Sequence, residues 1–220
     1  MMALGMSGAP EDRAVVHVVD DDDALRRALE RLFRSVGLET MVYPTARDFI
    51  EAAPQNVPGC IVLDVRLPGI NGLDLQAQLG GLGIHLPVVL MTGHGDVPMT
   101  VRAMKAGAVD FLAKPFRDQD MLDAVATAIE RDRTRRSKES EFAGLQERFE
   151  ALSPRERQVM LLVTAGKLNK QVAGDLGISE VTVKIHRSAA MRKMGVRTLA
   201  DLVRMTDALK SAGPQASHSA

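Results

Sequence analysis

The chain has little cysteine and no long apolar run, and both absences narrow the class of protein. Cys60 is the single cysteine among 220 residues, so an intrachain disulfide is impossible and a secreted disulfide scaffold is excluded. Nowhere do about 18 consecutive apolar residues occur, and residues 1–13 contain no basic region followed by an apolar stretch. We therefore expect a cytoplasmic protein with no membrane partner.

The net charge of the chain is zero, but its charged residues are unevenly distributed. Residues 1–130 hold 11 Lys and Arg against 18 Asp and Glu, whereas residues 131–220 hold 17 against 10. Within the second segment, residues 151–210 hold 11 basic and 5 acidic side chains, which favours a polyanionic partner, although many basic faces merely stay solvated. The length exceeds one ordinary domain, so we expect an acidic module joined to a smaller basic one.

Short apolar runs alternate with amphipathic stretches between residues 15 and 129. Runs of this kind without polar alternation indicate strands buried on both faces, as in a parallel sheet covered by helices. Strands are expected over 15–19, 38–43, 61–63, 88–91 and 109–112, and helices over 25–36, 73–79, 97–104 and from about 119. The pattern predicts an α/β fold with five strands.

A charged segment separates this region from the basic one. Residues 131–141 include no apolar side chain, after which Phe142, Leu145, Phe149 and Leu152 recur at helical spacing. We expect a charged helical linker over 131–150, then an all-α module over 151–210. Residues 211–220 are expected to form a disordered tail.

Polar side chains end four of the predicted strands. Asp20 to Asp23 follow the first strand, Asp64 the third, Thr92 the fourth and Lys114 the fifth. Because ligands of doubly wound sheets bind beyond the carboxyl ends of the strands, these groups should converge at one edge. One of Asp22 and Asp23 is expected to cap the next helix, which leaves Asp20 and Asp21 for metal binding.

Clustered carboxylates repel one another, and a hard divalent cation such as Mg²⁺ relieves that repulsion. A carboxylate can attack an activated phosphoryl group while an ammonium and a hydroxyl stabilise its oxygens. A lone aspartate at a strand end is more often a loop or cap residue. Compatible groups from four separate strands instead favour a phosphoryl-transfer site.

The basic module carries helix-start signals at three places. The string Ser153 to Glu156 supplies a serine cap, a proline in the first turn and a glutamate that closes a capping box. Asn169 and Ser179 can cap two further helices, with Gly177 in the left-handed turn between them. Helices are therefore expected over 154–165, 170–176 and 180–194, and the last two form a helix-turn-helix candidate.

The third of these helices has two different faces. Val183, Ala190 and Met194 share the side expected to face the core. The opposite side carries Val181, Lys184, Ile185, Ser188 and Arg192. Such a mixture can contact phosphates, base edges and thymine methyl groups in a major groove, although a generic amphipathic helix more often presents an ordinary solvated face.

Four strings in the first module carry a family resemblance. They are Val18 to Asp22 with Arg26, Val62 to Gly72, Met91 to Asp96, and Asp110 to Phe116. Residues 13–130 resemble the receiver domain of two-component response regulators. The resemblance implies a CheY-like doubly wound sheet of strand order 2-1-3-4-5, with Asp64 as the phosphoacceptor.

The same resemblance assigns further roles. Asp20, Asp21, Asp64 and the backbone carbonyl of Arg66 form the implied Mg²⁺ site. Lys114 is the implied phosphate contact, joined by a cis peptide bond to Pro115, and Thr92 with Phe111 forms the implied switch pair.

The second module resembles the LuxR-type DNA-binding domain. The strings that carry this resemblance are Leu152 to Met160, Asn169 to Ala173, Leu176 to Ser179, and Thr182 to His186. With a receiver in front, the whole chain is similar to the FixJ/NarL family of transcriptional regulators. The implied DNA contacts are Lys184, Ile185, Ser188, Arg192 and Lys170, and a last helix over 198–209 would support dimerisation.

We therefore hypothesise a phosphorylation-dependent transcription regulator rather than an enzyme. Its expected partners are a sensor histidine kinase, promoter DNA and a second copy of the chain, with RNA polymerase as a possible further one. One alternative is a Mg²⁺-dependent aspartyl-phosphate phosphohydrolase, which commonly needs an acid two residues after the nucleophile, where Arg66 stands. The other alternative is a non-transcriptional phosphate sink or adaptor, against which the basic module argues.

Overall fold

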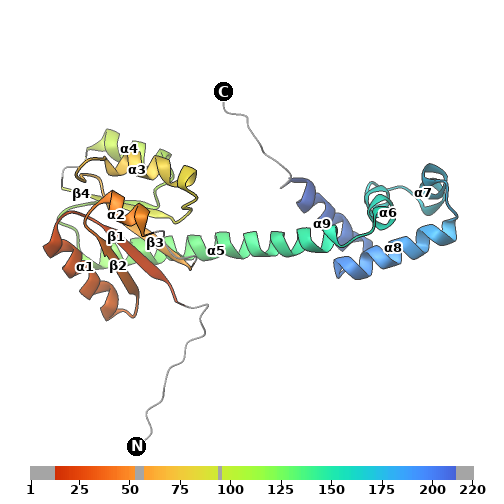
Figure 1. Cartoon of the computed structure of the whole chain (residues 1–220), viewed down its shortest axis with the longest axis horizontal. Helices are drawn as coiled ribbons and strands as arrows, with labels where there is room; N and C mark the ends of the chain where they lie inside the picture. The colour runs from red at the N-terminus through yellow and green to blue at the C-terminus, as the bar shows by residue number, and fades with distance from the viewer. Residues whose placement is uncertain (1–12, 53–56, 94–95, 212–220) are drawn as a thin grey trace, which may run out of the picture. The chain divides into compact units, whose positions relative to one another are not determined.

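A computed structural model describes residues 13–52, 57–93 and 96–211 (Figure 1). The chain divides between Arg136 and Ser137 into two compact units. His94 and Gly95 of the receiver-like strings lie outside the described residues, as does the expected tail apart from Ser211. Ser211 corrects that expectation, because it is the last residue of a helix and its hydroxyl donates to the carbonyl of Ala208 at 3.0 Å.

The first unit contains one parallel five-stranded sheet. Its strands are β1 (Val15–Val19), β2 (Glu39–Tyr43), β3 (Gly59–Asp64), β4 (Val88–Thr92) and β5 (Asp110–Ala113). They lie in the order β2-β1-β3-β4-β5, which confirms the predicted α/β fold and topology.

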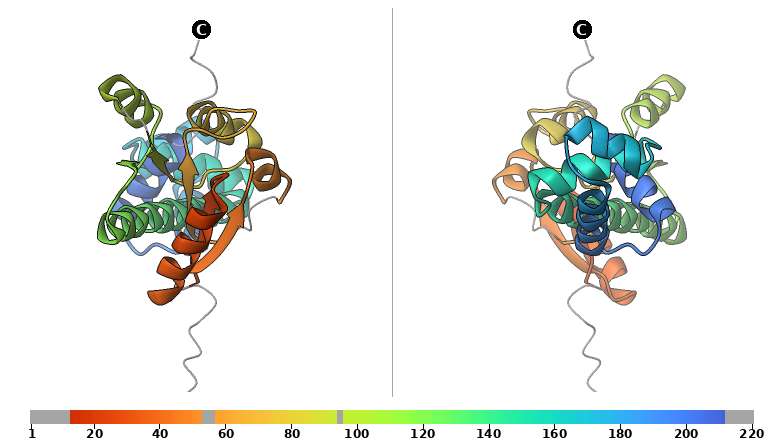
Figure 2. Two further views of the ribbon diagram at one scale, coloured as in Figure 1. Left: turned by 90° about the vertical axis from the view of Figure 1, so that its left-hand side faces the viewer. Right: turned by 90° about the vertical axis from the view of Figure 1, so that its right-hand side faces the viewer.

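Helices cover both faces of this sheet, as Figures 1 and 2 show. The helices are α1 (Asp23–Ser35), α2 (Ala46–Glu51), α3 (Gly72–Leu79), α4 (Val97–Lys105) and α5 (Asp118–Glu150), with a 3-10 turn at Gly80–Leu82. Phe33 of α1 and Met121 of α5 pack with Val18 on one face, and Phe49 of α2 and Leu75 of α3 pack with Val19 on the other. Neighbouring residues of β1 thus enter different cores, which is why every residue of the strand except His17 is apolar.

The second unit is all-helical and has its own core. It contains the end of α5 together with α6 (Pro154–Thr164), α7 (Asn169–Leu176), α8 (Glu180–Met194) and α9 (Leu199–Ser211). Leu145 and Phe149 of α5 pack into this core with Val183 and Leu202. The expected charged linker over 131–150 is therefore the last part of one 33-residue helix. Within the described residues, no helix has the length and apolar character needed to cross a bilayer.

Most of the predicted helix starts are found. Asp22 caps α1, where its carboxylate accepts from the amide of Ala24 at 2.8 Å. Ser153 and Glu156 form the capping box of α6, and Ser179 caps α8.

The predicted cap of α7 was wrong. Asn169 is the first residue of that helix, and Leu168 is the cap. The side-chain oxygen of Gln171 accepts a hydrogen bond from the amide of Leu168 at 2.8 Å. A glutamine in the first turn thus satisfies the backbone N–H of the cap residue. The last helix begins one residue later than expected, because Thr198 acts as a cap and accepts from the amide of Asp201 at 3.1 Å.

Candidate functional site

Three carboxylates meet at the carboxyl ends of the central strands. Asp20 and Asp21 follow β1, and Asp64 is the last residue of β3. One oxygen from each lies within 4.8 Å of the others. Asp20 is 0% exposed and Asp64 is 6% exposed, whereas Asp21 lies at the surface. The fold thus brings together the acidic groups that were expected, from the strand pattern alone, to converge at this edge of the sheet.

Lys114 supplies the positive charge of this cluster. Its Nζ lies 2.6 Å from Oδ2 of Asp20 and 3.2 Å from Oδ2 of Asp64. Burial acts to lower the pKa of Lys114, but the hydrogen bonds and charges of Asp20 and Asp64 outweigh it and raise that pKa. The ammonium group therefore stays charged between the two carboxylates.

Asp20 is held by its own neighbours along the chain. Its Oδ1 accepts from the amide of Asp22 at 2.8 Å, while its Oδ2 accepts from Lys114. Its backbone carbonyl accepts from Nη1 of Arg26 at 2.6 Å. Arg26 belongs to the first receiver-like string, and its contact with the backbone of Asp20 was not expected. With both carboxylate oxygens engaged, Asp20 is fixed beside Asp64.

The two carboxylate oxygens of Asp64 differ in their contacts with the described residues. Its Oδ1 is buried and has no hydrogen-bond partner among the described residues. Burial raises the pKa of Asp64, the charge of Lys114 opposes that rise, and the charge of Asp20 adds to it. A buried, unpaired carboxylate oxygen is costly unless a ligand contacts it. Three carboxylates with such an oxygen among them are hard oxygen donors, so the residues fit Mg²⁺.

The helix after Asp64 is packed tightly against this strand end. A Cβ atom on Gly72, the first residue of α3, would lie 2.2 Å from the carbonyl oxygen of Asp64. The amide of Gly72 donates to the carbonyl of Val65 at 2.8 Å. Only glycine allows this approach, which fixes the loop that contains Arg66. Arg66 is exposed and forms a bridge with Asn71.

The remaining receiver positions lie on or directly after β4, which pairs with β3, and β5, which pairs with β4. Thr92, the last residue of β4, is fully buried and pairs in register with Ala113 of β5. Phe111 of β5 is half-buried and packs against the core beneath α2, α3 and α4. The peptide bond between Lys114 and Pro115 is cis, as the resemblance implied.

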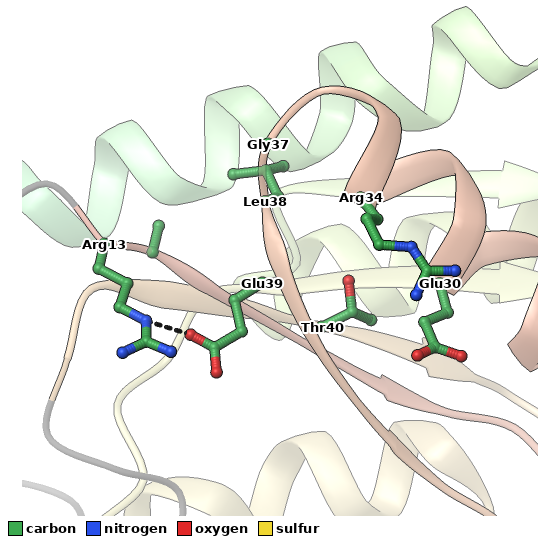
Figure 3. Close-up of a pocket in the computed structure, with 8 residues that line it drawn as sticks. Arg13, Glu30, Arg34, Gly37, Leu38, Glu39 and Thr40 are labelled. Atoms are coloured by element: carbon green, nitrogen blue, oxygen red, sulfur yellow. Dashed lines mark hydrogen bonds and ion pairs between the residues drawn. The ribbon is translucent and has the colours of Figure 1, made fainter. Parts of the chain in front are cut away.

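A separate hollow lies at the other edge of the sheet (Figure 3). Its volume is about 470 Å³, and residues at the start of β1, the end of α1 and the start of β2 line it. Arg13 and Glu39, which both line it, form an ion pair, and Figure 3 shows Arg34 beside Glu30 in the same hollow. The hollow is at the amino ends of the strands, so it is distinct from the carboxylate cluster.

In the second unit, three of the five expected DNA contacts line one groove, and a fourth is exposed on the same helix. Lys184, Ser188 and Arg192 line a groove of about 520 Å³, and Ile185 is 62% exposed. The opposite side of α8 is buried through Val183, Ala190 and Met194, as predicted.

Lys170 of α7, the fifth expected contact, is exposed. Asn169 and Arg187 also line the groove, and neither was expected as a DNA contact. Arg187 follows Lys184 by three residues, and that helical spacing could have identified it.

Comparisons with known proteins agree with both halves of this description. Residues 16–126 match the response regulator receiver domain, and residues 150–206 match the bacterial regulatory proteins of the luxR family. The chain is 57% identical over 197 residues to nodulation protein W of Bradyrhizobium diazoefficiens, covering 90% of this chain and 87% of that protein. It is 46% identical over 190 residues to the transcriptional regulatory protein FixJ of Azorhizobium caulinodans, covering 86% and 90%.

A solved structure extends the likeness to the fold. The response regulator StyR matches with a TM-score of 0.81 at 45% identity, covering 89% of this chain and 99% of that one. The acidic strand-end cluster, the helix-turn-helix surface and these full-length relatives agree with one another. The chain belongs to the two-component response regulators that join a receiver domain to a LuxR-type DNA-binding domain, a family of transcription regulators that includes the FixJ proteins.

Proposed function

We propose that Asp64 accepts a phosphoryl group from a sensor histidine kinase, and that the modified chain dimerises and binds promoter DNA more tightly. The observation that carries this proposal is the buried, unpartnered Oδ1 of Asp64, beside a lysine ammonium and two further carboxylates. A group in this position can bond to phosphorus without first losing a protein partner. The surrounding charges suit an incoming phosphoryl group and a divalent cation.

The transfer exchanges one bond to phosphorus for another. An oxygen of Asp64 bonds to the phosphorus as the bond to the donor histidine nitrogen breaks. The electron pair of the broken bond returns to the imidazole, which takes up a proton. Lys114 and the hydroxyl of Thr92 would then contact the phosphoryl oxygens, since Nζ of Lys114 lies 3.2 Å from Asp64 and Thr92 follows Met91, the register partner of Asp64 on β4.

The proposed Mg²⁺ ligands are Asp21, Asp64 and the backbone carbonyl of Arg66, with Asp20 as the second member of the acidic pair. Lys114 already contacts Oδ2 of Asp20 and Oδ2 of Asp64. Asp21 is exposed, so its carboxylate can turn toward a cation. When bound, Mg²⁺ supplies positive charge that offsets the negative phosphoryl oxygens.

The proposed switch links Thr92 to the surface of the receiver. Movement of its hydroxyl toward the phosphoryl group would let Phe111 turn inward and reshape the surface of α4, β5 and α5. Phe111 is half-buried, so part of its ring can leave solvent in such a turn. Two receivers would pair on that surface and bring two α8 helices to one duplex, which raises affinity through effective concentration.

The proposed DNA contacts follow the exposed surface of the second unit. Lys184, Ile185 and Ser188 would face the bases, while Arg192 and Lys170 would contact the backbone. We place the receiver at residues 13–130, the linker at 131–150 and the DNA-binding domain at 151–210. A protein that binds chromosomal DNA would act in the cytoplasm. RNA polymerase would be a further partner of this protein.

A labelling experiment tests the phosphoacceptor. Wild type and Asp64→Asn are incubated with a phosphorylated sensor kinase or with acetyl phosphate, and only the wild type is expected to take up label. Asp74→Asn is a matched control, because Asp74 is an exposed aspartate of α3 in the same unit. Equal labelling of wild type and Asp64→Asn would refute the assignment.

The phosphohydrolase alternative predicts a different result in the same assay. Such an enzyme would release phosphate from small esters over many turnovers. The position two residues after Asp64 carries the exposed cation Arg66, so an acid for protonating a leaving group is absent there.

A further inference from the structure

Four aspartates follow one another where β1 leads into α1, and their carboxylates differ in their contacts. The carboxylate of Asp20 accepts from Lys114 and from the amide of Asp22. That of Asp22 caps α1, and that of Asp23 forms ion pairs with two arginines. Among the described residues, Asp21 is the one of the four whose carboxylate has no hydrogen bond or ion pair. Of this run, only that carboxylate is free to turn toward a cation.

Arg26 of α1 contacts this run of aspartates at two points. Its Nη1 donates to the backbone carbonyl of Asp20 at 2.6 Å, and its Nη2 lies 3.1 Å from Oδ1 of Asp23. The side chain of Arg26 is 11% exposed, so it is largely shielded from solvent. A guanidinium group presents its N–H groups in a rigid planar fork, which can hold two acceptors at a fixed separation. Arg26 thus ties the end of β1 to the first turn of α1.

Arg27 provides a comparison on the same helix. Its Nη1 lies 2.8 Å from Oδ2 of Asp23, but its side chain is 62% exposed. In the part of the chain that the structure describes, Arg27 makes no hydrogen bond to Asp20. The two arginines therefore carry the same charge and share Asp23 as a partner. They differ in the hydrogen bond to the backbone beside the acidic site.

We propose that Arg26 is a positioning residue for the phosphoryl-transfer site. By holding the carbonyl of Asp20, it fixes the turn from which the carboxylate of Asp21 reaches a cation. By pairing with Asp23, it keeps a further carboxylate out of that site. This inference rests on the proposed function, because it concerns the Mg²⁺ binding and phosphoryl transfer proposed above.

The charge of Arg26 and its hydrogen bonds act on cation binding in opposite directions. Like charges repel, so loss of Arg26 would tighten Mg²⁺ binding if charge alone mattered. Groups that orient a metal ligand favour the cation, so loss of the hydrogen bond to Asp20 weakens binding instead. The sign of the change therefore distinguishes a positioning residue from a nearby charge.

Isothermal titration calorimetry of the full chain with MgCl₂ measures this sign without any reaction. Arg26→Met should bind Mg²⁺ about tenfold more weakly than the wild type, the lower end of the loss caused by removing a group that orients a metal ligand. Arg27→Met is the matched control, because it removes the same charge and another partner of Asp23. Its affinity for Mg²⁺ should not fall.

Two further readouts test whether the effect comes from the turn itself. In the metal-free chain, the NMR amide resonance of Asp22 reports its hydrogen bond to Asp20, and it should shift more in Arg26→Met than in Arg27→Met. The initial rate of labelling by acetyl phosphate should fall in Arg26→Met at limiting Mg²⁺ and recover at saturating Mg²⁺. Urea denaturation checks that each variant is folded.

Arg26→Lys keeps the inference testable if Arg26→Met does not fold. A lysine ammonium group keeps the charge but lacks the planar fork, so this variant should also bind Mg²⁺ more weakly than the wild type. Wild-type affinity in Arg26→Lys would overturn the positioning role. So would a folded Arg26→Met that binds Mg²⁺ as tightly as the wild type or more tightly, or an equal loss of affinity in Arg26→Met and Arg27→Met.

These outcomes separate the inference from the function on which it rests. If Arg26→Met binds Mg²⁺ and takes up label as the wild type does, while Asp64→Asn takes up none, the positioning role falls and the phosphoacceptor assignment stands. If the wild type neither binds Mg²⁺ nor takes up label from acetyl phosphate, both fall.

Discussion

The two units of this protein place their functional side chains in opposite environments. In the receiver, Asp20 and Asp64 are buried and are assembled from separate strands. In the DNA-binding domain, Lys184 and Ile185 lie exposed on a single helix. A buried charge needs partners from the surrounding fold, whereas an exposed one needs only a helix that holds it. Substitutions in the receiver site should therefore change stability and function together, and substitutions on α8 should change function alone.

The largest stability effect is expected for Lys114→Met. This change removes the cation 2.6 Å from the fully buried Asp20, and loss of one partner from a buried pair costs about 3 kcal/mol. Urea denaturation of the full chain measures the loss, and added Mg²⁺ should recover part of it.

Lys105→Met is the control for that experiment. Lys105 is exposed at the end of α4, so Lys105→Met should change the free energy of unfolding of the chain by less than about 0.5 kcal/mol. Equal effects of the two substitutions would contradict the account of a buried, charge-dependent cluster.

A second effect in the receiver depends on pH. His17 is 1% exposed, its Nδ1 lies 3.1 Å from the hydroxyl of Tyr43, and burial lowers its pKa from 6.5 to about 4. The folded state keeps His17 neutral while the unfolded chain takes up a proton below pH 6.5. Its contribution to stability is thus complete above pH 6.5 and is lost as the pH falls toward 4, by about 3 kcal/mol.

The variant His17→Gln isolates this contribution. The unfolding free energy of the wild type should fall more steeply between pH 7 and pH 4 than that of His17→Gln. His85→Gln serves as the comparison because His85 is exposed, and it should follow the wild type. Parallel curves for wild type and His17→Gln would show that the buried ring does not carry the effect.

The smallest stability effect is expected on α8. Lys184→Ala should change the free energy of unfolding by less than about 0.5 kcal/mol, because the side chain is exposed. Promoter affinity should nevertheless fall, and if Lys184 neutralises a phosphate the salt dependence of binding should decrease by about one unit of slope. Lys210→Ala, at an exposed position of α9, should leave both unchanged. Unchanged affinity for Lys184→Ala would remove this residue from the interface.

Much of this fold could be predicted because its determinants are local. Strands β1, β3 and β4 are buried at every position, so they appear in the sequence as mostly apolar runs. Asp22 and Ser179 cap helices through hydrogen bonds to residues two and three positions ahead, which a short string reveals. Helix α2 was not anticipated, because its six residues are too few to show a helical period.

The parts that could not be predicted depend on contacts between distant residues. Asp132 is fully buried in α5, and its Oδ2 accepts from the amide of Gly59, 73 residues away, at 3.1 Å. The surrounding sequence of Asp132 is highly charged, so the pattern indicated only a solvated helix. The meeting of Asp20 with Lys114 is equally non-local, and it was expected from fold topology and family resemblance rather than from spacing.

The central claim is that a phosphoryl group on Asp64 changes how the other domain binds DNA. The most direct measurement compares operator affinity and self-association for wild type and Asp64→Asn, each with and without acetyl phosphate and Mg²⁺. The account predicts that treated wild type dimerises and gains at least about a hundredfold in operator affinity, as bivalent binding allows, while Asp64→Asn does not respond. Equal affinity and equal self-association for treated and untreated wild type would contradict it.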